Sequence, residues 1–223
     1  MLKTLIQQEV LLAARNYSQW LTPLGFMVLV IMVCMISFTN NAAVAADILP
    51  ALLWVSILLA SLLTLPSLFA NDAEDGFISH YVLSPYPLLP LVITKVFCHW
   101  LVHVLPLCIA AILVAFGLGL IKTTLLTLGL TFLLGTPIVS LLGAMGASLT
   151  LAARQSTLLL PILLLPLYLP VLIFALGAIH ASELHLAIHG YIAIIVALLL
   201  FTSVFASLIA TISLKSGVAT CSG

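Results

Sequence analysis

Two histidines in an apolar stretch are the residues whose type and spacing suggest ligand chemistry most directly. His99 and His103 stand four positions apart, so on a helix their rings share one face, a spacing compatible with metal or haem ligation. Histidines inside a membrane also face a bundle interior and hydrogen-bond a neighbouring helix, and His99 is close enough to Lys95 and Trp100 to be an interfacial residue. The structural interpretation is favoured, and ligation is the alternative.

Three further histidines and one carboxylate gather in a short polar stretch near the C-terminus. His180, His185 and His189 are spaced by five and four, with Glu183 between them. A structural zinc site requires four ligands, and no cysteine is close by. A solvated loop is the favoured interpretation, while contact with a partner protein and metal binding are the alternatives.

The long polar interval at residues 71–95 holds three of the six acidic residues of the chain. Asp72, Glu74 and Asp75 precede Gly76 there. Asp72 or Asn71 can cap a short helix whose first turn holds Glu74 and Asp75, where the helix dipole favours negative charge. The pattern predicts a short amphipathic helix, and a merely solvated loop is the alternative.

The elements that position these residues are apolar to a degree that indicates an integral membrane protein. Of the 223 residues, 64% are hydrophobic and 5% charged, and the mean hydropathy is +1.39, whereas soluble domains are about a quarter charged. The formal net charge is zero, which argues against nucleic-acid binding. The four cysteines form no CxxC pair, so neither a disulfide framework nor a zinc site is predicted.

Hydropathy and length predict six membrane spans, preceded by a helix on the membrane surface. Residues 1–20 are amphipathic, but too short and too charged to cross a hydrocarbon core. The predicted spans are residues 21–38, 48–70, 96–121, 124–151, 157–179 and 191–214. We therefore expect an all-α polytopic membrane protein with a single transmembrane domain over residues 1–223.

The distribution of basic residues predicts the orientation of these spans. Six spans put both termini on one side, and outer loops then fall at residues 39–47, 122–123 and 180–190. With the N-terminus inside, the inner segments hold Lys3, Arg15, Lys95, Arg154 and Lys215, and the outer ones hold Lys122. The positive-inside rule therefore predicts that both termini and the segment 71–95 are cytoplasmic.

Two of the predicted spans contain residues that disturb a regular helix. Gly143 and Ala147 in the fourth span have the small-xxx-small spacing that lets another helix approach closely. The fifth span contains Pro161, Pro166 and Pro170, which predict a kinked or interrupted helix. Because lipid cannot satisfy an interrupted backbone, we expect both spans in the bundle interior.

Motifs of hydrolytic chemistry are absent from the sequence. There is no GxxxxGK[ST] loop for a nucleotide, no HExxH helix and no plausible Ser/His/Asp triad. An enzyme is therefore not expected, and any ATP energy must come from another chain.

Several blocks of the sequence resemble one known family. TLPSLFANDAEDGFISHYVLSPYPLLPLVITKVFCHW (64–100), LLGTPIVSLLGAMGASLTL (133–151), LLLPILLLPLYLPVLIFA (158–175) and HLAIHGYIAIIVALLL (185–200) look like successive blocks of CcmB, the haem exporter B permeases of c-type cytochrome maturation. The most specific pattern is DGxxxxxxLSPxPL, formed by Asp75, Gly76, Leu83, Ser84, Pro85, Pro87 and Leu88. The chain departs from the family pattern at residues 77–81.

The resemblance implies an ABC-2-like permease subunit in a bacterial or mitochondrial inner membrane. Its implied partners are a cytoplasmic ABC ATPase, which uses the ATP, a haem-handling inner-membrane protein and a small membrane peptide, with two copies of the permease per complex. No intrinsic cofactor is implied, and haem is the ligand that is transported or handled. The implied ATPase-coupling segment comprises Asp72, Glu74, Asp75, Gly76, Leu83, Ser84, Pro85 and Pro87, and His99 and His103 are candidates for a haem path.

Three functional hypotheses follow from the resemblance. The chain either exports haem or couples ATP hydrolysis to the release of a haem-loaded periplasmic chaperone, and the second mechanism is favoured. A scaffold that holds the haem-handling partner and transports nothing is the alternative from a different class. A secondary transporter that runs without an ATPase is a weaker third hypothesis.

Overall fold

The computed structural model describes residues 17–37, 42–69, 88–152 and 159–219, and these are mostly helical. In chain order the elements are α2 (Tyr17–Ser37), α3 (Ala42–Leu62), α6 (Leu88–His99), the π-helical segment η1 (Trp100–Val104), α7 (Leu105–Gly117), α8 (Lys122–Ala152), α9 (Leu159–Glu183) and α10 (His189–Ala219). The all-α prediction is confirmed for the part of the chain that the structure describes.

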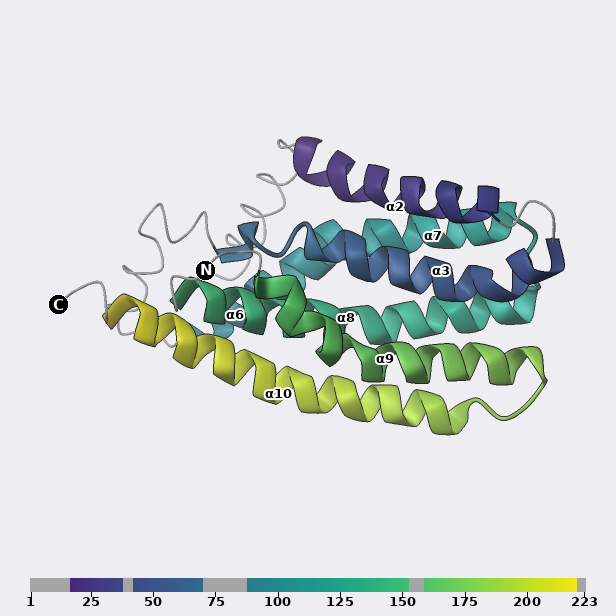
Figure 1. Cartoon of the computed structure of the whole chain (residues 1–223). Helices are drawn as coiled ribbons and strands as arrows, with labels where there is room; N and C mark the ends of the chain where they lie inside the picture. The colour runs from purple at the N-terminus through teal and green to yellow at the C-terminus, as the bar shows by residue number, and fades with distance from the viewer. Residues whose placement is uncertain (1–16, 38–41, 70–87, 153–158, 220–223) are drawn as a thin grey trace.

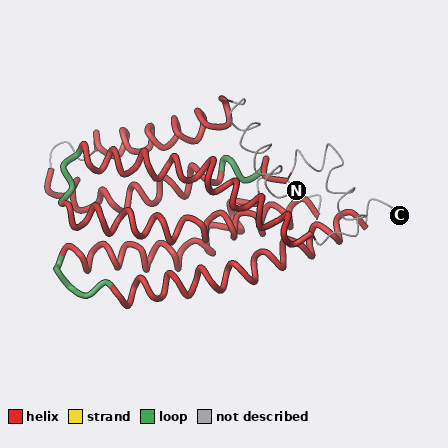
Figure 2. The backbone as a smooth tube through the Cα atoms, turned by 180° about the vertical axis from the view of Figure 1, so that it is seen from behind, coloured by secondary structure: helices red, strands yellow, loops and turns green. Residues whose placement is uncertain are grey.

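The long helices lie side by side with roughly parallel axes (Figure 1). Helix α8 is central, because it packs against α3, α6, α7, α9 and α10, whereas α2 lies at one edge and packs against α3 and α7. Figures 1 and 2 show the α7–α8 and α9–α10 turns at one end of the bundle, and the start of α2 and the end of α10 at the other. This arrangement is the one expected when consecutive spans alternate in direction.

Among the described residues, four helices are long and apolar enough to cross a membrane, and two further apolar helices are shorter. The four are Leu88–Gly117, Lys122–Ala152, Leu159–Glu183 and His189–Ser216, and the two shorter ones are Leu21–Ser37 and Ala46–Leu62. These lengths support a polytopic membrane protein. The count of six crossings stays a prediction.

The first two predicted spans differ from the observed helices at their ends. Helix α2 is already helical at Tyr17, so residues 17–20 belong to it and not to the surface helix predicted for residues 1–20, whose remainder lies outside the described residues. Helix α3 begins at Ala42 and not at residue 48, so Asp47 lies on a helix and not in the predicted outer loop.

Helix α3 also ends earlier than predicted, at Leu62 and not at residue 70. The physical reason is Pro66, which has no amide hydrogen to donate and disfavours the helical conformation of Leu65 before it. The chain turns instead, with the Leu63 amide donating to the Ala60 carbonyl at 3.2 Å.

The third predicted span, residues 96–121, begins too late. Helix α6 begins at Leu88, and Pro90 is tolerated because the first helical turn needs no amide donor there. The last part of the segment 71–95 is therefore helical. Lys95, which the topology argument counted in an inner loop, is on α6 and only 7% exposed.

The third span contains a π-helical segment, η1, directly after His99. The Leu105 amide donates to the Trp100 carbonyl, five residues earlier. Pro106 follows at once, and its ring both removes a donor and collides with the carbonyl four residues before it in a regular α-helix. Widening to a π turn relieves that collision, and such segments are frequent at functional sites.

Helix α8 confirms the prediction of an interior helix with closely approaching neighbours. A Cβ atom at Gly143 would collide with the side chain of Leu65, and one at Gly146 would lie 3.0 Å from Leu164 on α9. Of the 18-residue apolar stretch of α8, 56% is buried inside the bundle. The small residues therefore let the turn that follows α3, and α9, pack against the α8 backbone.

Helix α9 is continuous through Pro166 and Pro170, so the predicted interruption is not observed. Pro166 and Pro170 are exposed. The buried residues of α9 include Leu164, Tyr168, Val171 and Ala175, whose spacings of four and three define a face roughly opposite the two prolines. The N-terminal part of α9 slants relative to the rest of the helix (Figure 1). Because the rings of Pro166 and Pro170 point away from the bundle, they leave the packing face of α9 undisturbed.

Two helices end in the same capping motif with different residues at the critical position. At the end of α7, Gly119 has φ 80°, Leu120 donates to Ala115 and Gly119 donates to Phe116. At the end of α9, His185 has φ 55°, Leu186 donates to Ala181 and His185 donates to Ser182. Both are Schellman motifs, whose left-handed position strongly favours glycine.

We therefore expect His185→Gly to stabilise the protein by up to about 1 kcal/mol, because glycine adopts the left-handed conformation without a Cβ penalty. Gly119→Ala is the matched control and should destabilise it by a similar amount. Thermal unfolding of the purified protein in detergent measures both. A lower midpoint for His185→Gly would contradict the role of this backbone conformation.

Candidate functional site

The predicted ATPase-coupling residues lie outside the described part of the chain. These are Asp72, Glu74, Asp75, Gly76, Leu83, Ser84, Pro85 and Pro87. The described residues on either side are Phe69 and Leu88. Leu88 is the first residue of α6, and α6 begins at the bundle end where α10 finishes (Figure 1). The segment therefore leads into α6 at that end.

His99 and His103 lie together, as their spacing predicts. Their ring centroids are 5.2 Å apart with an interplanar angle of 21°, so the two imidazoles are stacked face to face. His99 is the last residue of α6 and is 4% exposed, while His103 lies in η1 and is half-buried.

A neighbouring segment holds the His99 ring by a hydrogen bond. The Thr64 hydroxyl and His99 Nε2 are 2.9 Å apart, and the same hydroxyl donates to the Ser61 carbonyl at 2.8 Å. A hydroxyl has one hydrogen. Because Thr64 donates it to Ser61, His99 Nε2–H is the donor to Thr64, and Nδ1 of the neutral ring is left as an acceptor.

This geometry restricts what the two histidines can ligate. Two axial histidine ligands of one haem iron approach it from opposite sides with their ring nitrogens, whereas these rings stack on each other, and His99 Nε2 is already engaged by Thr64. Within the described ranges there is also no group of three or more His, Cys, Asp or Glu side chains that could hold a metal ion. His99 is buried and bonds a neighbouring segment, and the haem-path role of the pair stays a prediction.

A hydrogen-bond network at the same level was not anticipated from the sequence. Trp100 Nε1 donates to Thr136 Oγ1 on α8 at 2.9 Å, Cys108 Sγ lies 3.8 Å from the same oxygen, and Thr136 itself donates to the Phe132 carbonyl. Thr136 precedes Pro137. The available signal was the polar Thr136 beside a proline within a span, because such positions need extra hydrogen bonds in lipid.

Replacing Thr136 by Val should destabilise the bundle by about 1–3 kcal/mol, because the Trp100 indole N–H then loses its acceptor in a partly buried site. Thr150→Val is the matched control on the same helix, since the Thr150 hydroxyl bonds only carbonyls of α8. Thermal unfolding monitored by tryptophan fluorescence measures the difference. Equal midpoints for the two variants would contradict this role of Thr136.

The histidines at the other end of the bundle do not converge. His180 and Glu183 belong to the last turn of α9 and not to the predicted loop 180–190, because a polar helix end can project beyond the apolar region. The two form an exposed pair, with His180 Nδ1 3.7 Å from Glu183 Oε2. His185 and His189 are also exposed.

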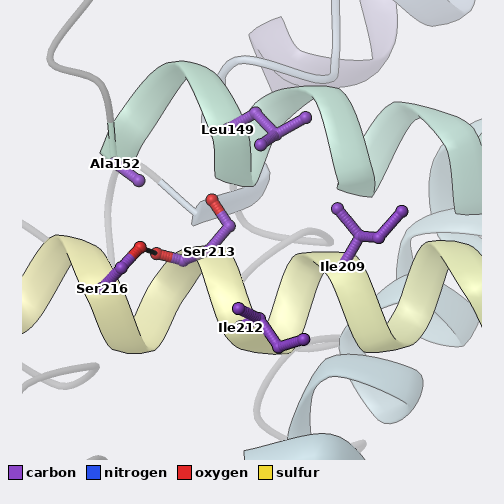
Figure 3. A pocket seen from close by; sticks show the side chains of 6 residues that line it. All are labelled: Leu149, Ala152, Ile209, Ile212, Ser213 and Ser216. Carbon is purple, nitrogen blue, oxygen red and sulfur yellow. Dashed lines mark hydrogen bonds between the residues drawn. The ribbon is translucent and has the colours of Figure 1, made fainter.

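A cavity of about 420 Å³ opens between α8 and α10 (Figure 3). Its lining residues are Leu149, Ala152, Ile209, Ile212, Ser213 and Ser216. Ser213 donates to the Ser148 carbonyl, and Ser216 donates to the Ser213 carbonyl. His99 and His103 are not among these lining residues.

Comparison with known proteins gives one consistent family. The model of the family described as CcmB protein matches residues 1–217. The chain is 42% identical over 188 residues to the heme exporter protein B of Pseudomonas aeruginosa, which covers 84% of each chain. It is 38% identical over 195 residues to that of Escherichia coli K12, covering 87% of this chain and 89% of the relative, and 36% identical over 195 residues to that of Haemophilus influenzae, covering 87% and 88%.

Proposed function

Because the chain belongs to the CcmB family, we propose that it is the membrane permease subunit of an ABC-type haem exporter complex that acts in c-type cytochrome maturation. The observation that carries the proposal is the family match over residues 1–217, together with relatives named heme exporter protein B that align over most of their length. The apolar helical bundle supports a subunit of the bacterial inner membrane.

The energy for this subunit comes from a separate cytoplasmic ABC ATPase. In support, the sequence contains no nucleotide-binding loop. The segment 71–95 is the proposed contact, since its acidic residues suit a short amphipathic helix that a groove of the ATPase can hold. Leu88 follows its undescribed part and begins α6 at one end of the bundle, and the proposal assigns this end to the cytoplasm together with both termini.

The proposed complex contains two copies of this chain, and two ATPase subunits dimerise on their cytoplasmic side. A haem-handling membrane protein and a small membrane peptide complete the complex. We favour a cycle in which ATP hydrolysis releases a haem-loaded chaperone from the haem-handling partner. In that cycle haem need not pass His99 and His103. The stacked rings and the Thr64 hydrogen bond support a positioning role for this pair.

Purification from native membranes in a gentle detergent, with identification of the co-purifying proteins, tests the proposal. We expect an ABC ATPase and a tryptophan-rich haem-handling membrane protein to co-purify with the chain. Isolation of the chain alone, from cells that mature c-type cytochromes and under conditions that preserve other ABC complexes, would contradict it.

A further inference from the structure

His99 Nδ1 and Ser140 Oγ are buried and have no hydrogen-bond partner among the described residues. His99 is 4% exposed and Ser140 is 1% exposed. Other buried hydroxyls donate to a carbonyl of their own helix, as Ser56 does to Leu52 and Ser148 does to Met145. Ser140 makes no such bond, although Ser148 on the same helix does. The geometry of the helix therefore does not explain why the Ser140 hydroxyl lacks a partner.

The contacts of neighbouring residues place Ser140 and His99 in the same region of the bundle. Thr136 and Gly143 lie one turn before and after Ser140, on the same face of α8. Thr136 accepts a hydrogen bond from Trp100, the residue after His99. Gly143 is in contact with Leu65, the residue after Thr64, which holds the His99 ring.

The two atoms therefore line one junction between the end of α3, α6 and α8, and they do not bond each other. Their chemistry is complementary to a small hydrogen-bonding guest. His99 Nδ1 accepts, because Nε2 carries the hydrogen that is donated to Thr64. The Ser140 hydroxyl both donates and accepts.

We propose that a water molecule binds at this junction, donates a hydrogen bond to His99 Nδ1 and bonds the Ser140 hydroxyl. Two orphaned polar atoms in a membrane interior are unfavourable, since each loses its hydration without compensation. Buried waters in proteins occupy sites of this kind, where otherwise unsatisfied polar groups converge. The inference does not depend on the proposed function.

A double-mutant cycle tests the bridge. His99→Gln retains an amide N–H that can donate to Thr64 but lacks the Nδ1 acceptor, and Ser140→Ala removes the hydroxyl. If water bridges the two, the loss of thermal stability in the double variant is smaller than the sum of the single losses, because either change alone already breaks the bridge. Ser148→Ala is the matched control and should be additive with His99→Gln. Additive losses for Ser140→Ala as well would overturn the proposal.

Magnetic resonance of the protein in nanodiscs, with ¹⁵N-labelled histidine, provides a readout that needs no unfolding. We expect magnetisation to pass from water to the His99 ring nitrogen that carries no hydrogen, with the signal assigned by its loss in His99→Gln. The transfer should weaken in Ser140→Ala and persist in Ser148→Ala. A His99 signal that receives no magnetisation from water in the unmodified protein would overturn the proposal.

Discussion

Replacing Asp75 by Arg and Gly76 by Leu in one variant will abolish co-purification of the ABC ATPase while leaving the chain inserted in the membrane. The first change reverses a charge in the predicted first turn of the coupling helix, where the dipole favours a carboxylate. The second places a bulky side chain where the family pattern has glycine. Both changes act on the surface that the proposed ATPase must grip, so we expect loss of the complex and not a graded weakening.

The matched control is Asp47→Arg, which makes the same charge reversal at an exposed position near the start of α3. Helix α3 begins at the bundle end opposite the start of α6 (Figure 1). This variant should retain the ATPase. Retention by the Asp75→Arg/Gly76→Leu protein would remove the segment 71–95 from the proposed interface.

Replacing Gly135 by Ala will destabilise the bundle by about 1–3 kcal/mol through overpacking. The added Cβ would lie 2.6 Å from Trp54 Cη2 and 3.2 Å from a methyl carbon of Val171. The Trp54 ring has little room to move, because it is fully buried, donates to Thr131 at 3.4 Å and packs on Phe132 with centroids 4.9 Å apart. The collision outweighs the gain in helix propensity of about 0.5–1 kcal/mol.

Gly25→Ala is the control for this prediction, since Gly25 also lies within a helix but a Cβ there would have no neighbour within 4 Å. It should leave the protein unchanged or slightly more stable. Thermal unfolding in detergent measures both, with a shift of about 2–4 °C per kcal/mol for a chain of this size. Equal midpoints for the two variants would show that the contact between α3 and α8 is looser than the structure describes.

The sequence predicted the helical segments well and the faces of those helices poorly. Apolar runs identify spans, because a membrane helix must be apolar over its whole length. For the same reason, hydropathy does not separate residues that face lipid from residues that face the bundle. The small residues of α8 carried that information, whereas the outward position of Pro166 and Pro170 depends on how α9 packs.

The helix ends and the π segment depended on single prolines, and a proline can change the backbone of a helix in more than one way. Pro66 ended α3, Pro90 was accommodated in the first turn of α6, and Pro106 produced a π turn. A proline in a helix forces some change in the backbone, but neighbouring helices select which one. The hydrogen bond from Trp100 to Thr136 is such a selecting contact, and it joins residues 36 positions apart.

The arrangement of the two histidines was also only partly predictable from the sequence. The spacing of His99 and His103 was enough to place both rings on one face. Their stacking, and the bond from His99 to Thr64, required the end of α3 to fold back beside α6, which depends on Pro66 and on tertiary packing.

The most direct test of an energy-coupled permease is c-type cytochrome maturation in cells that express this chain with an ATPase unable to hydrolyse ATP. The assembled complex should still form, because binding needs the coupling segment and not turnover. We predict that holocytochrome c, measured by haem staining, is lost. Normal holocytochrome levels with the inactive ATPase would contradict energy coupling and favour a scaffold that transports nothing.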